Sequence, residues 1–214
     1  SQVRRGEMNP IYKMSSAMGR LFRSGKRFCI DQRGVAAMEF ALIAPVLILM
    51  YMGSVETITG VDVDRKLNRA ATMMSALLTQ EKGTITKAKI SDIMNIGTAT
   101  LLPYTRDTPK ITVTSINVSD AGVATVEWSR RKVNGIETRP FTKGTVVTLD
   151  SNLLIKKTSV IRVDMSIAYV PMIAWTITGA VEKADGSAAV GIGLSDQSFG
   201  RVRIGQSSTT CSDC

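Results

Sequence analysis

The sequence offers few side chains that could carry out catalysis or bind a metal ion. Histidine is absent from all 214 residues, which removes the commonest acid–base group and the commonest protein ligand for metals. A Ser-His-Asp set or a Cys-His pair is therefore impossible, and no spacing of carboxylates indicates a catalytic pair. We expect no catalytic residue, no metal site and no cofactor, and we predict that the protein is not an enzyme.

Two short patterns approach known site motifs and fail at a defining position. Asp164–Ala168 approaches the Asp-x-Ser-x-Ser metal motif of von Willebrand-type adhesion domains, but Ala168 stands at the third ligand position. The pattern also lies inside an alternating stretch that is typical of a strand. Gly191-Ile192-Gly193 is followed by Asp196, where a dinucleotide-binding fingerprint requires glycine. Neither pattern predicts a site.

The sequence contains three cysteines, and two of them form the Cys-x-x-Cys pair Cys211 and Cys214. A redox pair of this kind normally opens a helix in a thioredoxin-like unit, whereas this pair ends the sequence. If the residues beyond 60 lie in an oxidising compartment, the pair can form a disulfide while Cys29 stays reduced. We predict a structural or labile Cys211–Cys214 disulfide of minor energetic weight.

The most informative carboxylate is Glu39, because it interrupts an apolar run. No side chain from Phe40 to Val55 is charged, and residues 35–58 contain only Glu39 and Glu56 as charged groups. A helix of that length reaches roughly 36 Å, which is enough to cross a hydrocarbon core of about 30 Å. Spanning helices also tolerate a proline such as Pro45. The run is longer than the apolar part of a cleaved signal peptide, so we predict an uncleaved anchor.

Positive charge is concentrated before this run. Residues 1–33 carry eight Lys or Arg and two acidic residues, which accounts for +6 of the net charge of +9. A basic arm could bind nucleic acid, but basic residues directly before a spanning helix act chiefly to keep the amino terminus cytoplasmic. We predict no nucleic-acid partner and four segments: a basic cytoplasmic leader (1–34), a transmembrane helix (35–59), a helical stalk (60–102) and a periplasmic antiparallel-sheet domain (103–214).

The stalk is predicted from helical periodicity. Apolar residues follow a 4-3-4-3 spacing with charged residues off the stripe, and Gly83 with Thr84 ends the pattern. A second, weaker helical pattern runs from about Thr86 to Leu102 and stops before Pro103. The predicted buried stripe of the first helix consists of Val63, Leu67, Ala70, Met74 and Leu77.

From Lys110 onward the apolar period changes to two, which predicts strands. Val160–Val170 is the clearest strand, with the odd-numbered residues 161–169 on one face, and Asn134-Gly135 is the strongest hairpin signal. A phase slip between Ile111–Val113 and Ile116–Val118 predicts a bulge. Further strands are predicted at Val123–Val133, Ile136–Phe141, Trp175–Val181 and Arg201–Ile204, with a turn at Asp185-Gly186. The predicted fold is α+β, with the transmembrane helix continuing into an amphipathic helix packed on an antiparallel sheet that has one buried face.

The head of the apolar run carries a family resemblance. Gly34, four further residues and then Glu39-Phe40 match the processing site of type IV prepilins. A larger set of positions falls at the spacings of the TadE/TadG-like family of the tight-adherence (Flp-type) pilus system: Gly34, Ala37, Glu39, Phe40, Ala41, Pro45, Gly53 and Glu56. Tyr169-Val170-Pro171 resembles that family's Tyr-x-Pro. Phe199–Arg203 resembles its closing basic strand, with Val202-Arg203 in place of the family's Pro-Arg. The resemblance covers residues 30–80 well and the remainder by general layout.

The resemblance implies a role for four residues. Cleavage after Gly34 by a prepilin peptidase would create a new amine on Val35 and would make Glu39 the fifth residue of the mature chain. In a helical bundle, Glu39 beside Phe40 could then pair with the amine of a neighbouring subunit and fix the axial register. Two simpler interpretations remain open: Glu39 reaches to water from the membrane edge, and Gly34 is an unprocessed helix start.

The resemblance further implies a non-enzymatic pilus-assembly protein of the pseudopilin or minor-pilin type in the bacterial inner membrane. Its expected partners are the pilus assembly platform, pilin subunits and a prepilin peptidase. The alternative is a membrane-anchored extracytoplasmic binding module unrelated to pili, with Gly34 unprocessed; a membrane-tethered enzyme is a third, weaker hypothesis. The first residue of the mature chain separates the first two hypotheses.

Overall fold

The computed structural model describes residues 33–81, 83–172, 179–202 and 209–214. Its internal contacts divide the chain into two units, residues 1–52 and 53–214, and each is described by itself. Several sequence predictions lie wholly or partly outside the described residues: most of the basic leader, Cys29, most of the strand at Trp175–Val181 and the end of the strand at Arg201–Ile204.

In the first unit, the described residues belong to a single helix. They form the amino-terminal part of α2 (Arg33–Gln80), which continues through Pro45. The most apolar window of this helix has a mean hydropathy of 2.1 and is not buried at all inside the protein. A helix that is apolar on every side and unpacked suits lipid better than water. The helix therefore fits the predicted membrane anchor.

In the second unit, the remainder of α2 buries one stripe against the sheet. Four of the five residues predicted for this stripe are buried, namely Val63, Leu67, Ala70 and Met74. At the fifth position the buried residue is Leu78 instead of the predicted Leu77, which is half-buried. A helix turns every 3.6 residues, so four residues after Met74 return closer to the same face than three do.

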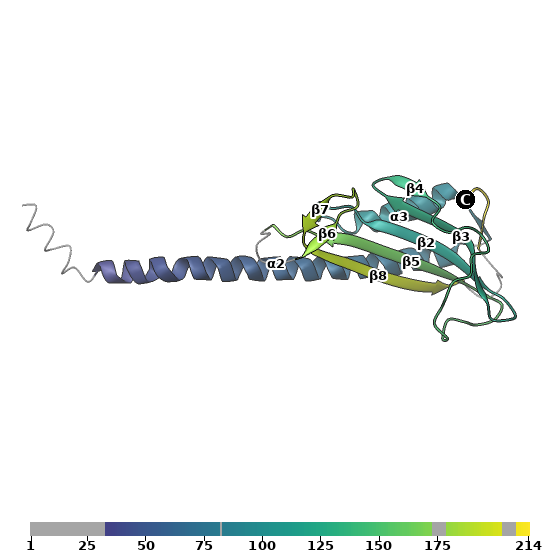
Figure 1. The fold of residues 1–214 in the computed structure, drawn as a ribbon, viewed down its shortest axis with the longest axis horizontal. Helices are drawn as coiled ribbons and strands as arrows, with labels where there is room; N and C mark the ends of the chain where they lie inside the picture. Colours follow the sequence, from purple (N-terminus) through teal and green to yellow (C-terminus); the bar gives the residue numbers. More distant parts are fainter. Residues whose placement is uncertain (1–32, 82, 173–178, 203–208) are drawn as a thin grey trace, which may run out of the picture. The chain divides into compact units, whose positions relative to one another are not determined.

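The sheet has five antiparallel strands in the order β4-β3-β2-β5-β8. Figure 1 shows these strands side by side, with α2 and α3 (Lys87–Ala99) along the sheet. The β2–β3 register shifts between Ser115 and Ile116, as predicted, but the extra residue is Glu127 on β3. Strand β2 itself has no bulge, because it pairs with β5 without interruption from Lys110 to Val118. The strand bounds are β2 (Lys110–Val118), β3 (Ala124–Val133), β4 (Ile136–Thr138), β5 (Thr158–Tyr169) and β8 (Ile192–Arg201).

The main core lies between the helices and one face of this sheet. All five odd-numbered residues predicted for the inner face of β5, from Ile161 to Tyr169, are buried. Helix α3 packs closely on α2, because a Cβ on Gly97 would overlap the sulfur of Met74. The hairpin turn is also as predicted, with positive φ at Asn134 and Gly135. The α+β fold class is confirmed.

The prediction of a sheet with one buried face is wrong for the end of the sheet near Val118. There a second, smaller core of Ile116, Val118, Ala124 and Leu149 forms on the other face, with Phe199 packed against it. The segment between β4 and β5 covers this core through Val147, Leu149, Leu153 and Leu154. Strand β2 is consequently buried on both faces over most of its length.

Two shorter pairings complete the described part of the fold. β1 (Thr84–Ile85) pairs in parallel with β9 (Thr210–Cys211), and β6 (Ala180–Glu182) pairs with β7 (Ala188–Val190). The predicted turn at Asp185-Gly186 connects β6 and β7, and Gly186 has a φ of 83°. The edge strand β8 ends at Arg201, whereas the sequence predicted a strand that begins at this residue.

Candidate functional site

The predicted processing motif occupies the first two turns of α2, in the first unit. The side chains of Val35, Glu39 and Phe40 are all exposed, and a Cβ on Gly34 would meet no other heavy atom. Within the described part of this unit, no other element packs on these residues. Any partner for them lies outside the described part of this unit. The roles of Gly34, Val35, Glu39 and Phe40 therefore stay predictions.

Glu56, the second carboxylate of the apolar run, lies in a different environment. It belongs to the second unit and is only 6% exposed. Its Oε1 accepts a hydrogen bond from the Tyr169 hydroxyl at 2.6 Å and another from the backbone N–H of Met172 at 3.0 Å. The Arg106 guanidinium lies 3.5 Å from the same oxygen. Burying a carboxylate costs several kcal/mol unless it is paired and hydrogen-bonded, and here both conditions are met.

Tyr169 connects this carboxylate to the sheet. It is the last residue of β5 and is buried, and its ring packs on Gly60, where a Cβ would lie 3.4 Å from the ring. Tyr104 stacks on it with the ring centroids 5.6 Å apart. Burial, and then the hydrogen bond to Glu56, raise the pKa of Tyr169 well above its usual value. The phenol therefore stays protonated and donates a hydrogen bond to the carboxylate.

A loop next to Tyr169 supplies hydrogen bonds to the end of β5, where β2 no longer pairs with it. Strand β2 begins at Lys110, opposite Ser166, so β5 extends beyond the end of β2. The Tyr104 hydroxyl donates to the carbonyl of Ala168 at 2.6 Å and accepts from the N–H of Val170 at 2.8 Å. The burial of Tyr104 raises its pKa, which keeps this hydroxyl protonated.

Two charged residues of the same loop complete the attachment. Arg106 donates to the carbonyl of Val170 at 2.7 Å, and its guanidinium lies over the Tyr104 ring. Asp107 accepts from the backbone N–H of Ala168 at 2.8 Å and from that of Ala184 at 3.0 Å. We call Glu56, Tyr104, Arg106, Tyr169 and Met172 the Glu56 cluster. Its hydrogen bonds and ion pair connect α2, the loop and the end of β5.

In the sequence, Glu56 stands out only as a second acidic interruption of the apolar run and as one position of the family resemblance. The tyrosine that binds it had been noticed separately, as part of a Tyr-x-Pro pattern. The two residues are 113 positions apart, and no local spacing connects them. Their common appearance among the positions of one family resemblance was the only available signal that they could meet.

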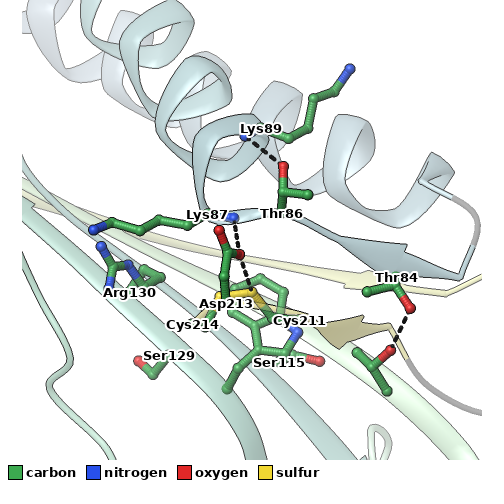
Figure 2. Close-up of a disulfide and its surroundings, with 12 residues drawn as sticks. Thr84, Thr86, Lys87, Lys89, Ser115, Ser129, Arg130, Cys211, Asp213 and Cys214 are labelled. Atoms are coloured by element: carbon green, nitrogen blue, oxygen red, sulfur yellow. Dashed lines mark hydrogen bonds between the residues drawn. A yellow bond between two sulfur atoms is a disulfide. The ribbon is translucent and has the colours of Figure 1, made fainter.

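The carboxy-terminal tail forms a second cluster, shown in Figure 2. Cys211 and Cys214 are joined by a disulfide, and both pack against the main core. Asp213 accepts a hydrogen bond from the backbone N–H of Lys87 at 2.7 Å and thereby satisfies a free donor in the first turn of α3. The Trp128 indole N–H donates to the carbonyl of Thr209 at 2.7 Å. The tail is held by several independent contacts besides the disulfide.

The two patterns that resembled other sites have structural roles in the fold. The Asp164 carboxylate accepts from Arg162 Nε at 3.0 Å and also from the Gln197 side chain. Gly191 precedes β8 at a close approach of two backbones, because a Cβ there would overlap the carbonyl of Tyr169. Cys211, Asp213 and Cys214 lie close enough together to hold an ion, but both sulfur atoms are taken up by the disulfide.

Comparison with known proteins adds one finding. Residues 34–73 match the family model described as TadE-like protein, which confirms the resemblance carried by the glycine–glutamate motif. The matched segment runs from Gly34 through Glu39 and Glu56 into the buried stripe of α2. It associates the chain with the tight-adherence pilus system and with a family that is generally non-enzymatic. No curated protein and no solved structure gives a significant match.

Proposed function

We propose that this protein is a non-enzymatic, membrane-anchored assembly component of a tight-adherence pilus or secretion system, of the pseudopilin or minor-pilin type. The observation that carries the proposal is the position of the TadE-like segment. It begins at the glycine of the prepilin-like motif and stays within one continuous helix, α2, as far as the stripe packed on the sheet. One helix thus carries the processing motif, the anchor and the attachment of the sheet.

The proposed topology follows from charge and cysteine chemistry. The excess of +6 before residue 34 favours a cytoplasmic leader (1–34), and a transmembrane helix (35–59) then crosses the inner membrane. The helical stalk (60–102) and the sheet domain (103–214) lie in the periplasm, an oxidising compartment where the Cys211–Cys214 disulfide persists. Reporter fusions after residue 30 and after residue 150 should report opposite compartments.

The proposed activity of the amino-terminal motif is assembly. A prepilin peptidase cleaves after Gly34, and Val35 becomes the first residue of the mature protein. Glu39 then pairs with the Val35 amine of a neighbouring pilin subunit, while Phe40 contacts that subunit or lipid. The exposure of Val35, Glu39 and Phe40 supports this proposal, because nothing in the described part of their own unit covers them. The pilus assembly platform is the further proposed partner.

The test is the mass of the membrane-extracted protein, with and without the prepilin peptidase of the same cells. We expect a chain that starts at Val35 when the peptidase is present. Gly34→Leu should leave a chain longer by the leader. An unchanged wild-type mass in both strains would refute processing, and a failure to co-purify with pilus components as well would favour the alternative of an unrelated binding module.

A further inference from the structure

The Glu56 cluster lies near the proposed end of the membrane span, within the second unit. The proposed span ends at residue 59, and a helix rises about 1.5 Å per residue, so Glu56 lies only about 4.5 Å before that end. The backbone N–H of Met172 and the Tyr169 hydroxyl both bind the Glu56 carboxylate. If residues 35–59 span the bilayer, the Tyr169–Met172 end of the sheet lies at the lipid–water boundary.

The side chains around this point suit that boundary. Met172 is 73% exposed and Ile58 is 69% exposed, while Glu56 is buried. The polar atoms of Glu56 are thus turned inward, and apolar side chains are turned outward. Arg106 lies beside them, partly exposed, and the contacts to Val170 and Glu56 are both made by its Nη1. A guanidinium has five N–H donors, so donors remain for a phosphate.

We propose that this end of the sheet unit is a phospholipid-binding surface, which we call the collar and define as Val55, Ile58, Arg106 and Met172. Met172 enters the boundary between headgroups and acyl chains, and Arg106 binds a headgroup phosphate. The occupant is lipid because the surface is continuous with the proposed span on α2, and because an exposed cation beside exposed apolar groups matches an anionic headgroup above acyl chains. The inference rests on the proposed membrane anchoring.

The test uses the full chain in nanodiscs of phosphatidylethanolamine and phosphatidylglycerol, with an environment-sensitive fluorophore on single cysteines. Cys29→Ser provides the background, since Cys211 and Cys214 are held in a disulfide. The probe at Met172→Cys is compared with one at Leu47→Cys in the span. Val146→Cys is the matched control, because Val146 is 68% exposed but lies at the far end of the sheet, where it bridges to Thr125.

We expect lipids with a quencher on the upper acyl chain to quench the Met172 probe and lipids with a quencher deep in the acyl chain to quench the Leu47 probe. Neither lipid should change the Val146 probe. If only the Leu47 probe is quenched, the proposal that the collar binds lipid is wrong, and the proposed membrane anchor is still supported. If neither the Leu47 nor the Met172 probe is quenched, the membrane anchoring in the proposed function is itself wrong. A Met172 probe that is shielded from water but unquenched by lipid would show a protein contact and would overturn the proposal.

The second arm tests the role of Arg106. A basic residue close to an anionic membrane shifts the binding equilibrium by about fivefold. Adding phosphatidylglycerol to neutral nanodiscs should therefore raise the ratio of quenched to unquenched Met172 probe by about that factor, and Arg106→Gln should remove the increase. Arg201→Gln, which changes a cation at the far end of β8, should retain it. An equal response in both variants would refute the headgroup contact of Arg106.

Discussion

Glu39 and Glu56 are the two carboxylates that interrupt one apolar run, and the fold treats them in opposite ways. Glu39 lies on the exposed first turns of α2, whereas Glu56 is buried against Tyr169, Met172 and Arg106. A carboxylate in or near a membrane needs a partner. Glu56 finds its partners within its own chain. Glu39 has none in the described part of its unit, so any partner must come from outside it.

This difference separates folding from assembly. Changes at Glu56 should act on the stability of the sheet unit and should be measurable on the isolated protein. Changes at Glu39 should leave that stability intact and act only where a second molecule is present.

The largest effect is expected for Glu56→Leu. The substitution leaves the Met172 N–H without its acceptor and Arg106 without its counter-charge, and the Tyr169 hydroxyl keeps only the Glu56 carbonyl at 3.1 Å. Removing one partner of a buried ion pair typically costs about 3–5 kcal/mol. We expect a loss of that order in the free energy of unfolding, measured by denaturant unfolding of the full chain in detergent.

A smaller effect is expected for Tyr169→Phe. The ring and its stacking on Tyr104 remain, and only the hydroxyl is lost. Removing one of several donors from a buried acceptor lowers the free energy of unfolding by about 1–3 kcal/mol. A double-mutant cycle with Glu56→Gln should give a coupling energy of at least about 0.5 kcal/mol, as residues in direct contact do. Strict additivity of the two changes would show that the hydrogen bond contributes nothing.

The same tyrosines predict a loss of stability in alkali. Burial raises the pKa of both Tyr104 and Tyr169 in the folded protein. The unfolded chain loses these protons from about pH 10, while the folded chain retains them. Stability contributed by the neutral phenols is therefore complete below about pH 10 and falls above it, by at most about 1.4 kcal/mol per pH unit for each group. Unfolding measured from pH 8 to 11 should show this fall, and Tyr169→Phe should reduce its slope.

A still smaller effect is expected when the disulfide is removed. A bond between Cys211 and Cys214 closes a very short loop, and the entropic model assigns such a loop less than the roughly 3 kcal/mol of a 15-residue loop. The Asp213 and Trp128 contacts also hold the tail without it. Cys211→Ser should lower the free energy of unfolding by less than about 3 kcal/mol and leave the domain folded. If the variant did not fold, the disulfide would be required to hold the carboxy-terminal tail in place.

How much of this arrangement could be predicted from sequence depends on how local its cause is. Neighbouring residues determine three features that were predicted: the stripe of α2, the alternation of β5 and the Asn134-Gly135 turn. Most of strand β8 was missed, because its inner face carries Asp196, Ser198 and Gly200 where a buried strand would alternate apolar residues. Gly200 has a reason that only the fold reveals: α2 passes so close that a Cβ there would overlap the Ser75 hydroxyl.

The candidate site shows the same difference between features with a local cause and features with a long-range cause. The Gly34 motif and the apolar run are contiguous, so a single sequence displayed them. The Glu56 cluster brings together residues from α2, the loop after α3 and the end of β5. Its members have no common period, and the loop residues Tyr104 and Arg106 belong to no pattern at all. Such a site appears only when the sheet positions the end of β5 beside the helix.

The smallest effect on stability, and the largest on assembly, is expected for Glu39→Leu. Removing a charge from the edge of a span eases insertion by up to about 3 kcal/mol, so the variant should insert at least as well as the wild type. Because Glu39 touches nothing in the described part of its unit, unfolding of the sheet unit should be unchanged. If Glu39 pairs with the new amine of a neighbour, however, the variant should fail to co-purify with pilus components and should block piliation.

The matched comparison is Glu56→Gln in the same cells. Glutamine retains an acceptor for Tyr169 and Met172 but loses the charge that faces Arg106, so this variant should lower stability while the copies that remain folded still capture partners. Partner capture is therefore measured per folded molecule. Normal pili and normal capture with Glu39→Leu would contradict the register role, because the charge would then serve only to reach water from the membrane edge. Equal loss of capture per folded molecule in both variants would instead remove the separation between folding and assembly.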